Sequence, residues 1–323
     1  MKLFDRILLD IKSLAERRHK LDISVISQMN APYEIDKDFF LIAKRIIQAK
    51  RKKSAIILMA GAHIIRSGIQ NYLIDLMKRG YISCIATNGA FMIHDFEFSL
   101  IGATCEDVAY YIKRGQFGLW KETSQINDVI NRAYLKDTTI GMGEAVGCYI
   151  EESNMPYKKI SILATCYRLK IPITIHVGIG YDIIHQHPNC DGRTTGCLSY
   201  NDFLRFVSIV QNLENGVIMN FGSAVMGPEV FLKALSMARN IALQKGKNIR
   251  RFTTLVCDLY PLPEDFKKEP SLDSFLYYFR PLKTMLIRTV ADGGKSFYIC
   301  GKHSETMPKL WQAINLEEKD EDT

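Results

Sequence analysis

The stretch from Gly216 to Asn240 reads GVIMNFGSAVMGPEVFLKALSMARN, and it predicts a strand, a glycine turn and a helix in succession. Val217 to Phe221 form a short apolar run of the kind found in buried strands. Residues 222–224 are small enough for backbone N–H groups to approach a ligand closely, and Pro228 suits the first turn of a helix. Such a unit is a common binding place for a phosphate or a dinucleotide, although any α/β protein contains several of these turns.

The composition indicates a globular chain. With 323 residues and 47% hydrophobic content, the chain can bury one large core or two modest ones. No stretch approaches the roughly 18 to 20 uninterrupted apolar residues of a membrane helix, and Asp5 and Asp10 interrupt the first residues in a way that a signal peptide does not. Eight cysteines without framework spacing predict reduced, buried thiols in a cytoplasmic protein.

The net charge of +7 has an ordinary explanation. The basic runs Arg17–Lys20 and Lys50–Lys53 fall in predicted helices, where such runs are usually solvated faces. A nucleic-acid interface would combine basic and aromatic residues on one face, and neither run does so, so we expect no nucleic-acid partner. The positive balance is compatible with an anionic cofactor.

Strands alternate with helices along most of the chain, which predicts an α/β fold: a single Rossmann-like domain with a mostly parallel sheet and helices on both faces. The expected strands are residues 54–60, 81–86, 172–177, 217–221, 251–257, 284–290 and 297–300. The expected helices are residues 38–53, 63–78, 157–169, 202–213, 230–241 and 305–314. Residues 93–107 are expected to form a polar and aromatic loop, and residues 141–147 fit a turn or a helix start equally well.

No linker divides this pattern, so the predicted domain runs from residue 54 to 315. We expect residues 1–53 to form a helical extension interrupted at Ala31-Pro32-Tyr33, and residues 316–323 to form an acidic, disordered tail.

Ligands of open parallel sheets bind beyond the carboxyl ends of the strands. Three small-residue turns are expected there: Gly61–Ser67, Thr87–Ala90 and Gly222–Ala224. None fits the G-x-G-x-x-G fingerprint within one βαβ unit, which argues against an ordinary Rossmann dehydrogenase. The sequence therefore predicts a cofactor site assembled from separated loops.

The richest polar cluster contains Asp182, His185, His187, Cys190 and Asp191. We expect His187 to accept a proton and Asp182 to orient the imidazole or to hold a substrate cation. A zinc site is an alternative, although the spacing fits no standard closed site. A loop in which these side chains bond to the backbone is another.

A second cluster, His94 with Asp95 and Glu97, follows the Thr87–Ala90 turn, close to the expected position of a nicotinamide ring. His94 is a candidate for catalysis, and a structural loop histidine is an equally good interpretation. His63, in the first turn, is expected to line the cofactor pocket.

The turns also occur in a familiar order. The sequence resembles the deoxyhypusine synthase family in the order and spacing of its motifs, over about residues 54–260. The motifs are Ser67-Gly68-Ile69, Thr87-Asn88-Gly89-Ala90, Gly115-Gln116-Phe117 with Leu119, Ile130-Asn131-Arg132, the 182–187 loop and Gly222-Ser223-Ala224. The resemblance implies a single NAD-binding α/β domain, usually in a homotetramer with active sites at a dimer interface; from the sequence we expect a homo-oligomer, either a dimer or a tetramer. In that family NAD oxidises spermidine, and a butylamine unit passes through an enzyme-lysine imine to a lysine of a translation factor.

The resemblance also implies roles for individual residues. It assigns contacts with NAD to Ser67, Thr87, Gly89, Ala90, Gly222, Ser223 and Ala224, and handling of the amine to Asp182 and His187. Four further residues of the strand ends complete the expected cofactor site: Gly61, His63, Asn88 and Asp258. No metal is expected.

Two departures from the family pattern alter the expected chemistry. The imine-forming lysine is replaced by Gly227, and Lys233 lies six residues further on. After Asp258 the family's acidic segment is missing, and Arg280 and Lys283 are present instead, which argues against spermidine.

We therefore expect an NAD-dependent enzyme that oxidises an amine-bearing or related small substrate, with or without alkyl-group transfer and without the lysine imine. The alternatives are an NAD-linked oxidoreductase or NAD-consuming enzyme that shares only the cofactor site, and a non-catalytic NAD-binding protein.

Overall fold

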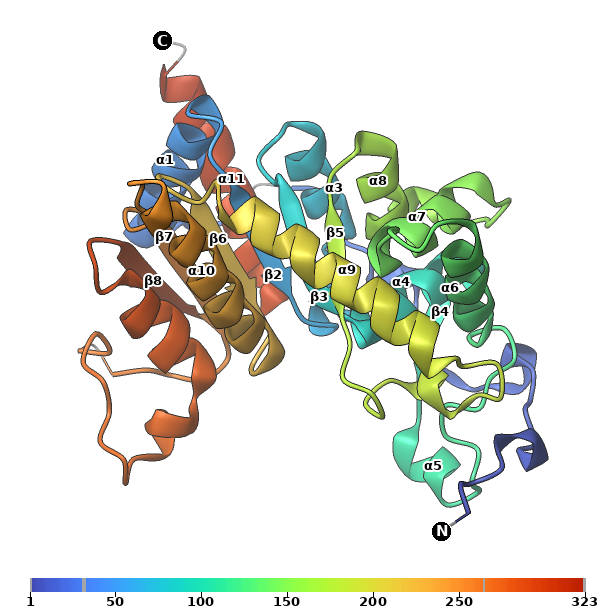
Figure 1. Ribbon diagram of the computed structural model, residues 1–323. Coiled ribbons are helices and arrows are strands. Elements are labelled where there is room, and N and C mark those ends of the chain that lie inside the picture. The colour runs from blue at the N-terminus through green and yellow to red at the C-terminus, as the bar shows by residue number, and fades with distance from the viewer. Residues whose placement is uncertain (1, 31–32, 264, 322–323) are drawn as a thin grey trace.

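A computed structural model of the chain describes residues 2–30, 33–263 and 265–321 (Figure 1). Its main sheet has six strands, and every neighbouring pair is parallel. From one edge to the other they are β5 (Ile173–His176), β3 (Cys84–Asn88), β2 (Ile56–Ala60), β6 (Val217–Phe221), β7 (Thr253–Asp258) and β8 (Lys295–Cys300). The predicted α/β class is confirmed.

The order of these strands has a direct consequence for ligand binding. The chain starts at the centre with β2 and moves outward through β3 to β5, then returns to the centre at β6 and moves outward the other way. This is the order of the doubly wound dinucleotide-binding fold, whose ligands bind where the direction reverses. Here the reversal lies between β2 and β6.

Helices cover both faces of the sheet (Figure 1). They are α1 (Lys37–Arg51), α2 (His63–Arg66), α3 (Gln70–Lys78), α4 (Gly89–Ile101), α5 (Val108–Ile112), α6 (Gln125–Lys136), α7 (Met142–Glu152), α8 (Ile162–Leu169), α9 (Gly192–Val210), α10 (Met226–Gln244) and α11 (His303–Glu321). In β2, Ile56 and Leu58 face the core shared with α1, α3, α4, α8 and α11, whereas Ile57 and Met59 face α9 and α10. The alternation of strand side chains thus produces two cores.

The region after β3 differs from the prediction. Residues 93–107, expected as a loop, lie in α4 and in β4 (Ala103–Glu106), and β4 pairs antiparallel with β1 (His19–Asp22). The Asn88 side chain begins α4 by accepting the Phe91 N–H. Because α4 is buried on most sides, its apolar residues show no helical stripe in the sequence.

Other segments also differ. Residues 284–290, expected as a strand, belong to a π-helical turn, Pro281–Ile287, and a 3₁₀ turn, Arg288–Val290; a short buried apolar run does not distinguish a strand from a helix. Residues 141–147 fall at the start of α7. The acidic end is helical as far as Glu321 rather than disordered from residue 316.

The first 53 residues were expected to form a helical extension, but before α1 they contain only short 3₁₀ turns and β1, and the basic run Arg17–Lys20 leads into β1 rather than lying in a helix. Most of the predicted interruption at residues 31–33 lies outside the described residues. In the described part of the chain, no helix is both long and apolar enough to span a membrane.

Candidate functional site

Two of the three predicted small-residue turns touch at the reversal point of the sheet. The Gly61 N–H donates to the Phe221 carbonyl at 2.9 Å, and a Cβ on Gly61 would lie 2.2 Å from the Gly222 carbonyl oxygen. Gly222 has a φ of +70°, which favours glycine. The third turn follows β3, the other neighbour of β2, so the strand register brings the three turns to one edge of the sheet.

The polar side chains of these turns are used within the protein. Each forms a hydrogen bond with a main-chain N–H or carbonyl group of its own turn or of a neighbouring segment. The bonds are Thr87 Oγ1 to Ala60 O (2.6 Å), Ser67 Oγ to His63 O (2.7 Å), Phe91 N to Asn88 Oδ1 (2.9 Å), Gly227 N to Ser223 Oγ (2.8 Å) and Leu259 N to Asp258 Oδ1 (2.7 Å). A ligand held by these turns would therefore meet mainly their backbone.

His303, which the sequence did not single out, lies over the Gly222 turn as the first residue of α11. A Cβ on Gly222 would lie 2.6 Å from His303 Nε2, and the side chain is only 9% exposed. One buried polar atom here, His303 Nδ1, has no hydrogen-bond partner among the described residues. Burial lowers the pKa of His303, the Asp258 carboxylate opposes this shift, and His63 reinforces it.

A cavity of about 290 Å³ lies at the same edge of the sheet, beside α4. It brings together three residues that the sequence predicted for the site: Ala90, His94 and Asp182. Other lining residues were not predicted for the site, and most of them lie on segments without recognisable motifs. These include Arg17, Arg66, Cys105, Glu106, Phe117 and Tyr181.

Asp182 occupies the start of α4. Its carboxylate accepts the Ala90 N–H, and a Cβ on Gly89 would lie 2.1 Å from its Oδ2 atom. Burial raises the pKa of Asp182 to about 6, and the bond from Ala90 limits the rise. The Asp182 carboxylate therefore already occupies the positive, N-terminal end of α4, where a cofactor phosphate would have been expected. A glycine is required at position 89 because a side chain there would collide with this carboxylate.

His94 has a defined tautomer. Its Nδ1 atom lies 2.8 Å from the Thr104 hydroxyl, and that hydroxyl donates its own hydrogen to Glu97 at 2.7 Å. Thr104 must therefore accept the Nδ1–H, which leaves the lone pair on Nε2. Burial lowers the pKa of His94 to about 4, so the imidazole is a neutral base at ordinary pH.

A buried ion pair supports this arrangement. Arg17 donates two bonds of 2.8 Å to Glu97, and each side chain is 1% exposed. The Thr123 hydroxyl adds a bond of 2.6 Å to Glu97. Burial alone would raise the pKa of Glu97, but the Arg17 charge and the surrounding donors outweigh it and hold that pKa below its usual value.

His187 lies outside the cavity lining. It is 1% exposed, and its Nε2 atom is 2.9 Å from the Gly118 carbonyl, to which it donates. Burial lowers the pKa of His187, and the Gly118 carbonyl partly opposes the shift. The geometry is that of a histidine that fixes a loop, and only Asp182 of its sequence cluster reaches the cavity.

The rest of that cluster also bonds to the backbone. His185 Nδ1 accepts the N–H groups of Gly180 and Asp182, and Asp191 caps α9. Across the described residues, no group of three or more His, Cys, Asp or Glu side chains is arranged to hold a metal ion. The zinc interpretation therefore has no support in this loop.

Position 227, where the deoxyhypusine synthase family has its imine-forming lysine, has no room for a side chain. A Cβ on Gly227 would lie 2.7 Å from Ser223 Oγ, so a lysine there would require the turn to shift. Lys233 forms an ion pair with Glu229, and its side chain is 56% exposed. Neither position offers an amine to the cavity.

His63 connects the cavity with the reversal point. A protonated His63 would lower the pKa of both His94 and His303, so His63 is close enough to interact electrostatically with each of them. Burial lowers the pKa of His63 itself, and Arg66 lowers it further. The carboxyl edge of the sheet therefore carries a row of polar side chains: Asp182, His94, His63, His303 and Asp258.

The sheet order and this edge define a Rossmann-like α/β protein. Residues 41–141 match a family model described as the C-terminal, Rossmann-fold part of ArgZ-like arginine dihydrolases. No curated protein matches the sequence.

Solved structures share the fold. ArgZ from cyanobacteria has 15% identity and a TM-score of 0.50, over 88% of this chain and 33% of ArgZ. Unliganded AgrE has 14% identity and a TM-score of 0.54, over 90% of this chain and 34% of AgrE. A putative LOR/SDH protein from Methanococcus maripaludis has 14% identity and a TM-score of 0.51, over 90% of this chain and 73% of the archaeal protein. The chain thus spans about a third of ArgZ and AgrE.

The resemblance to deoxyhypusine synthase gains little from these comparisons. A putative deoxyhypusine synthase from Entamoeba histolytica has 10% identity and a TM-score of 0.42, over 90% of this chain and 85% of that one. This similarity is too low to support an argument, so the family assignment stays a prediction.

Proposed function

We propose that the protein is an NAD-dependent enzyme that oxidises a small, amine-bearing substrate in the cavity beside α4. The observation that carries the proposal is the fixed tautomer of His94, which gives the cavity an unprotonated ring nitrogen, and the Asp182 carboxyl group lines the same cavity. A neutral imidazole and an ionisable carboxyl at the carboxyl edge of such a sheet are suited to proton transfer.

The cofactor fits the reversal point of the sheet. The backbone turns at Gly61 and Gly222 and the unpartnered Nδ1 atom of His303 offer groups that a dinucleotide could use. NAD would supply a hydride acceptor. AgrE, which has the same fold, has been solved as a ternary complex with ornithine and NAD⁺, and we take these ligands as the first to test.

The charges of the cavity suit a substrate with an amine. Above its pKa, Asp182 carries a negative charge that would attract an ammonium group, and Arg66 would attract a carboxylate. As the substrate carbon loses a hydride, the attached nitrogen must lose a proton, and His94 Nε2 would accept it. No amine of the chain reaches the cavity from position 227 or 233, which argues against transfer through a lysine imine.

Binding of NAD is expected and would be measured by isothermal titration calorimetry. Replacing His303 by leucine should weaken NAD by about tenfold, because a polar group beside Gly222 is lost. His187→Gln, which changes a buried histidine elsewhere, should leave the affinity unchanged. The absence of heat with both NAD and NADP would contradict the cofactor assignment.

The rate of oxidation is expected to rise as the pH passes about 6, the pKa to which burial raises Asp182, because the carboxyl is charged only above that value. His94 is already neutral at this pH. Asp182→Asn should remove the inflection and lower kcat/KM by roughly tenfold to a hundredfold. Asp191→Asn, in the same loop, should keep it. An unchanged profile in Asp182→Asn would exclude the role.

A further inference from the structure

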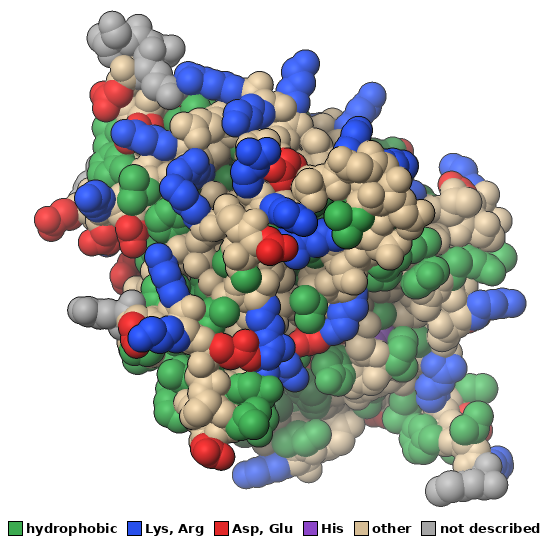
Figure 2. All heavy atoms as spheres, turned by 60° about the vertical axis from the view of Figure 1, so that its left-hand side comes forward, with side chains coloured by type: hydrophobic (Ala, Val, Ile, Leu, Met, Phe, Trp, Pro, Cys, Tyr) green, Lys and Arg blue, Asp and Glu red, His purple; other side chains and the backbone are tan. Residues whose placement is uncertain are grey.

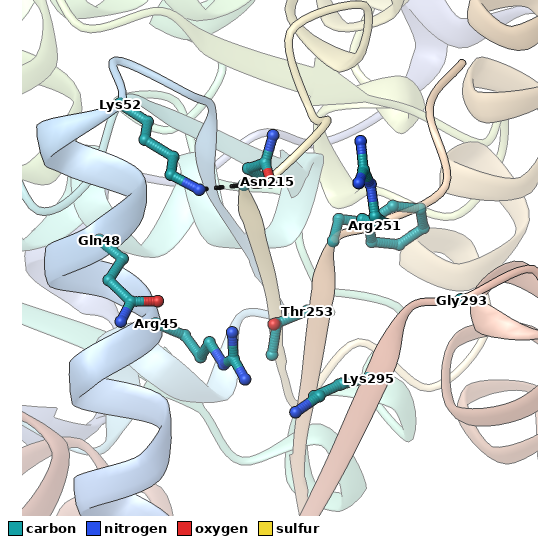
Figure 3. A pocket seen from close by; sticks show the side chains of 10 residues that line it. Arg45, Gln48, Lys52, Asn215, Arg251, Thr253, Gly293 and Lys295 are labelled. Carbon is teal, nitrogen blue, oxygen red and sulfur yellow. Dashed lines mark hydrogen bonds between the residues drawn. The ribbon is translucent and has the colours of Figure 1, made fainter.

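A hollow of about 270 Å³ lies at the opposite, amino-terminal edge of the main sheet (Figure 3). It is formed by α1, the turn before β6, and the first residues of β7 and β8. Four cationic residues line it, and none of its lining residues, all within the described chain, is an aspartate or glutamate. The four are Arg45, Lys52, Arg251 and Lys295.

Most of this charge is not neutralised by the protein. Arg45 and Lys295 form no ion pair among the described residues, and the Lys52 ammonium lies 3.5 Å from the neutral Asn215 Oδ1. Arg251 is paired with Glu214 at 2.9 Å. Three unpaired cations around one small hollow repel each other, and an anion between them would relieve that repulsion.

The side chains converge from separate elements. In Figure 3 the ends of Arg45 from α1 and Lys295 from β8 point toward one another, and Thr253 at the start of β7 lies above the space between them. A solvated helix face can explain a basic run such as Lys50–Lys53, but it does not explain cations that meet from a helix and a strand. A helix and a sheet also hold such groups more rigidly than loops do.

The overall charge favours an anion as well, because the chain carries a net charge of +7. Figure 2 shows that lysine and arginine side chains are most numerous over the upper part of the face that it displays. A positive field of this kind raises the local concentration of anions.

We propose that this hollow binds a compact ligand that carries phosphate groups. A guanidinium group binds phosphate oxygens in pairs and an ammonium group acts as a point charge, so Arg45 and Lys295 together match a diphosphate. The Thr253 hydroxyl and the Gln48 amide add neutral donors. The volume is below the range of about 300–1,000 Å³ that is typical for drug-sized ligands, which favours a small phosphorylated molecule over a whole dinucleotide.

The test is calorimetric titration of the full chain with inorganic pyrophosphate. The wild type should bind, and Arg45→Gln/Lys295→Gln should bind about a hundredfold more weakly, since each cation contributes about tenfold. The control Lys113→Gln/Lys159→Gln removes the same charge from exposed positions elsewhere and should bind as the wild type does. Each single variant is measured too, in case the double variant unfolds.

NAD itself contains a pyrophosphate, so the titration is repeated with excess NAD. The hollow lies at the other edge of the sheet from the proposed cofactor site, so pyrophosphate binding should not change. Absence of binding to the wild type, equal affinities in the two double variants, or displacement by NAD would each overturn the proposal. None of these results depends on whether the protein oxidises an amine.

Discussion

Replacing His94 by glutamine is expected to lower turnover by roughly 10²- to 10⁴-fold, the usual contribution of a positioned acid or base. Thr104 accepts the Nδ1 proton of His94, so Nε2 is the free base of the cavity. Glutamine keeps a similar volume and hydrogen-bonding capacity but provides no base. The measurement is NADH formation with the best amine found in a screen that begins with ornithine, and NAD affinity should be unchanged.

Two further variants separate chemistry from folding. Thr104→Val removes the acceptor that fixes the tautomer, so kcat should fall by about tenfold while KM changes little. His187→Gln alters a histidine that bonds to the Gly118 carbonyl, so it should lower the unfolding temperature and leave the turnover of the folded enzyme unchanged. If His94→Gln turned over at the wild-type rate, or if His187→Gln were the inactive variant, His94 would not be the base.

The architecture of the sheet was predictable because its signals are local. Each central strand is a short apolar run followed at once by small residues, as in Val217–Phe221 before Gly222, and such runs are typical of parallel sheets. That the three turns lie close together could be predicted because the carboxyl ends of parallel strands share one edge of the sheet.

Assembly into a dimer or tetramer and a cytoplasmic location stay predictions.

The site was predictable only in part, because its contacts are not local. Asp95 looked like a loop carboxylate beside His94, yet it is buried and accepts the Ser161 hydroxyl, 66 residues away, and the N–H groups of Ile162 and Leu163 at the start of α8. Glu97 finds its cation, Arg17, 80 residues upstream. Conversely, His187 follows Asp182 closely in the sequence, but only Asp182 reaches the cavity. No periodicity in a single sequence encodes such pairings.

Arg17→Met is expected to destabilise the protein by about 3–5 kcal/mol, because it leaves the Glu97 carboxylate buried without its cation. Methionine preserves much of the packing volume beneath Trp120, whose ring centroid lies 5.7 Å from the guanidinium carbon. The measurement is urea unfolding at neutral pH. Arg168→Met breaks the partly exposed pair with Glu151 and should cost only about 0–1 kcal/mol.

The charge itself can be isolated with Arg17→Met/Glu97→Gln, which should recover most of the lost stability because no buried carboxylate remains uncompensated. The pH dependence gives a second check. The folded-state pKa of Glu97 lies below the usual value of a glutamate, so the pair stabilises the wild type at neutral pH, and this contribution is lost as the pH falls through that lowered pKa. The difference between Arg17→Met and wild type should therefore shrink in acid. A difference that is constant with pH, or a double variant no more stable than Arg17→Met, would mean that Arg17 acts through packing rather than through its charge on Glu97.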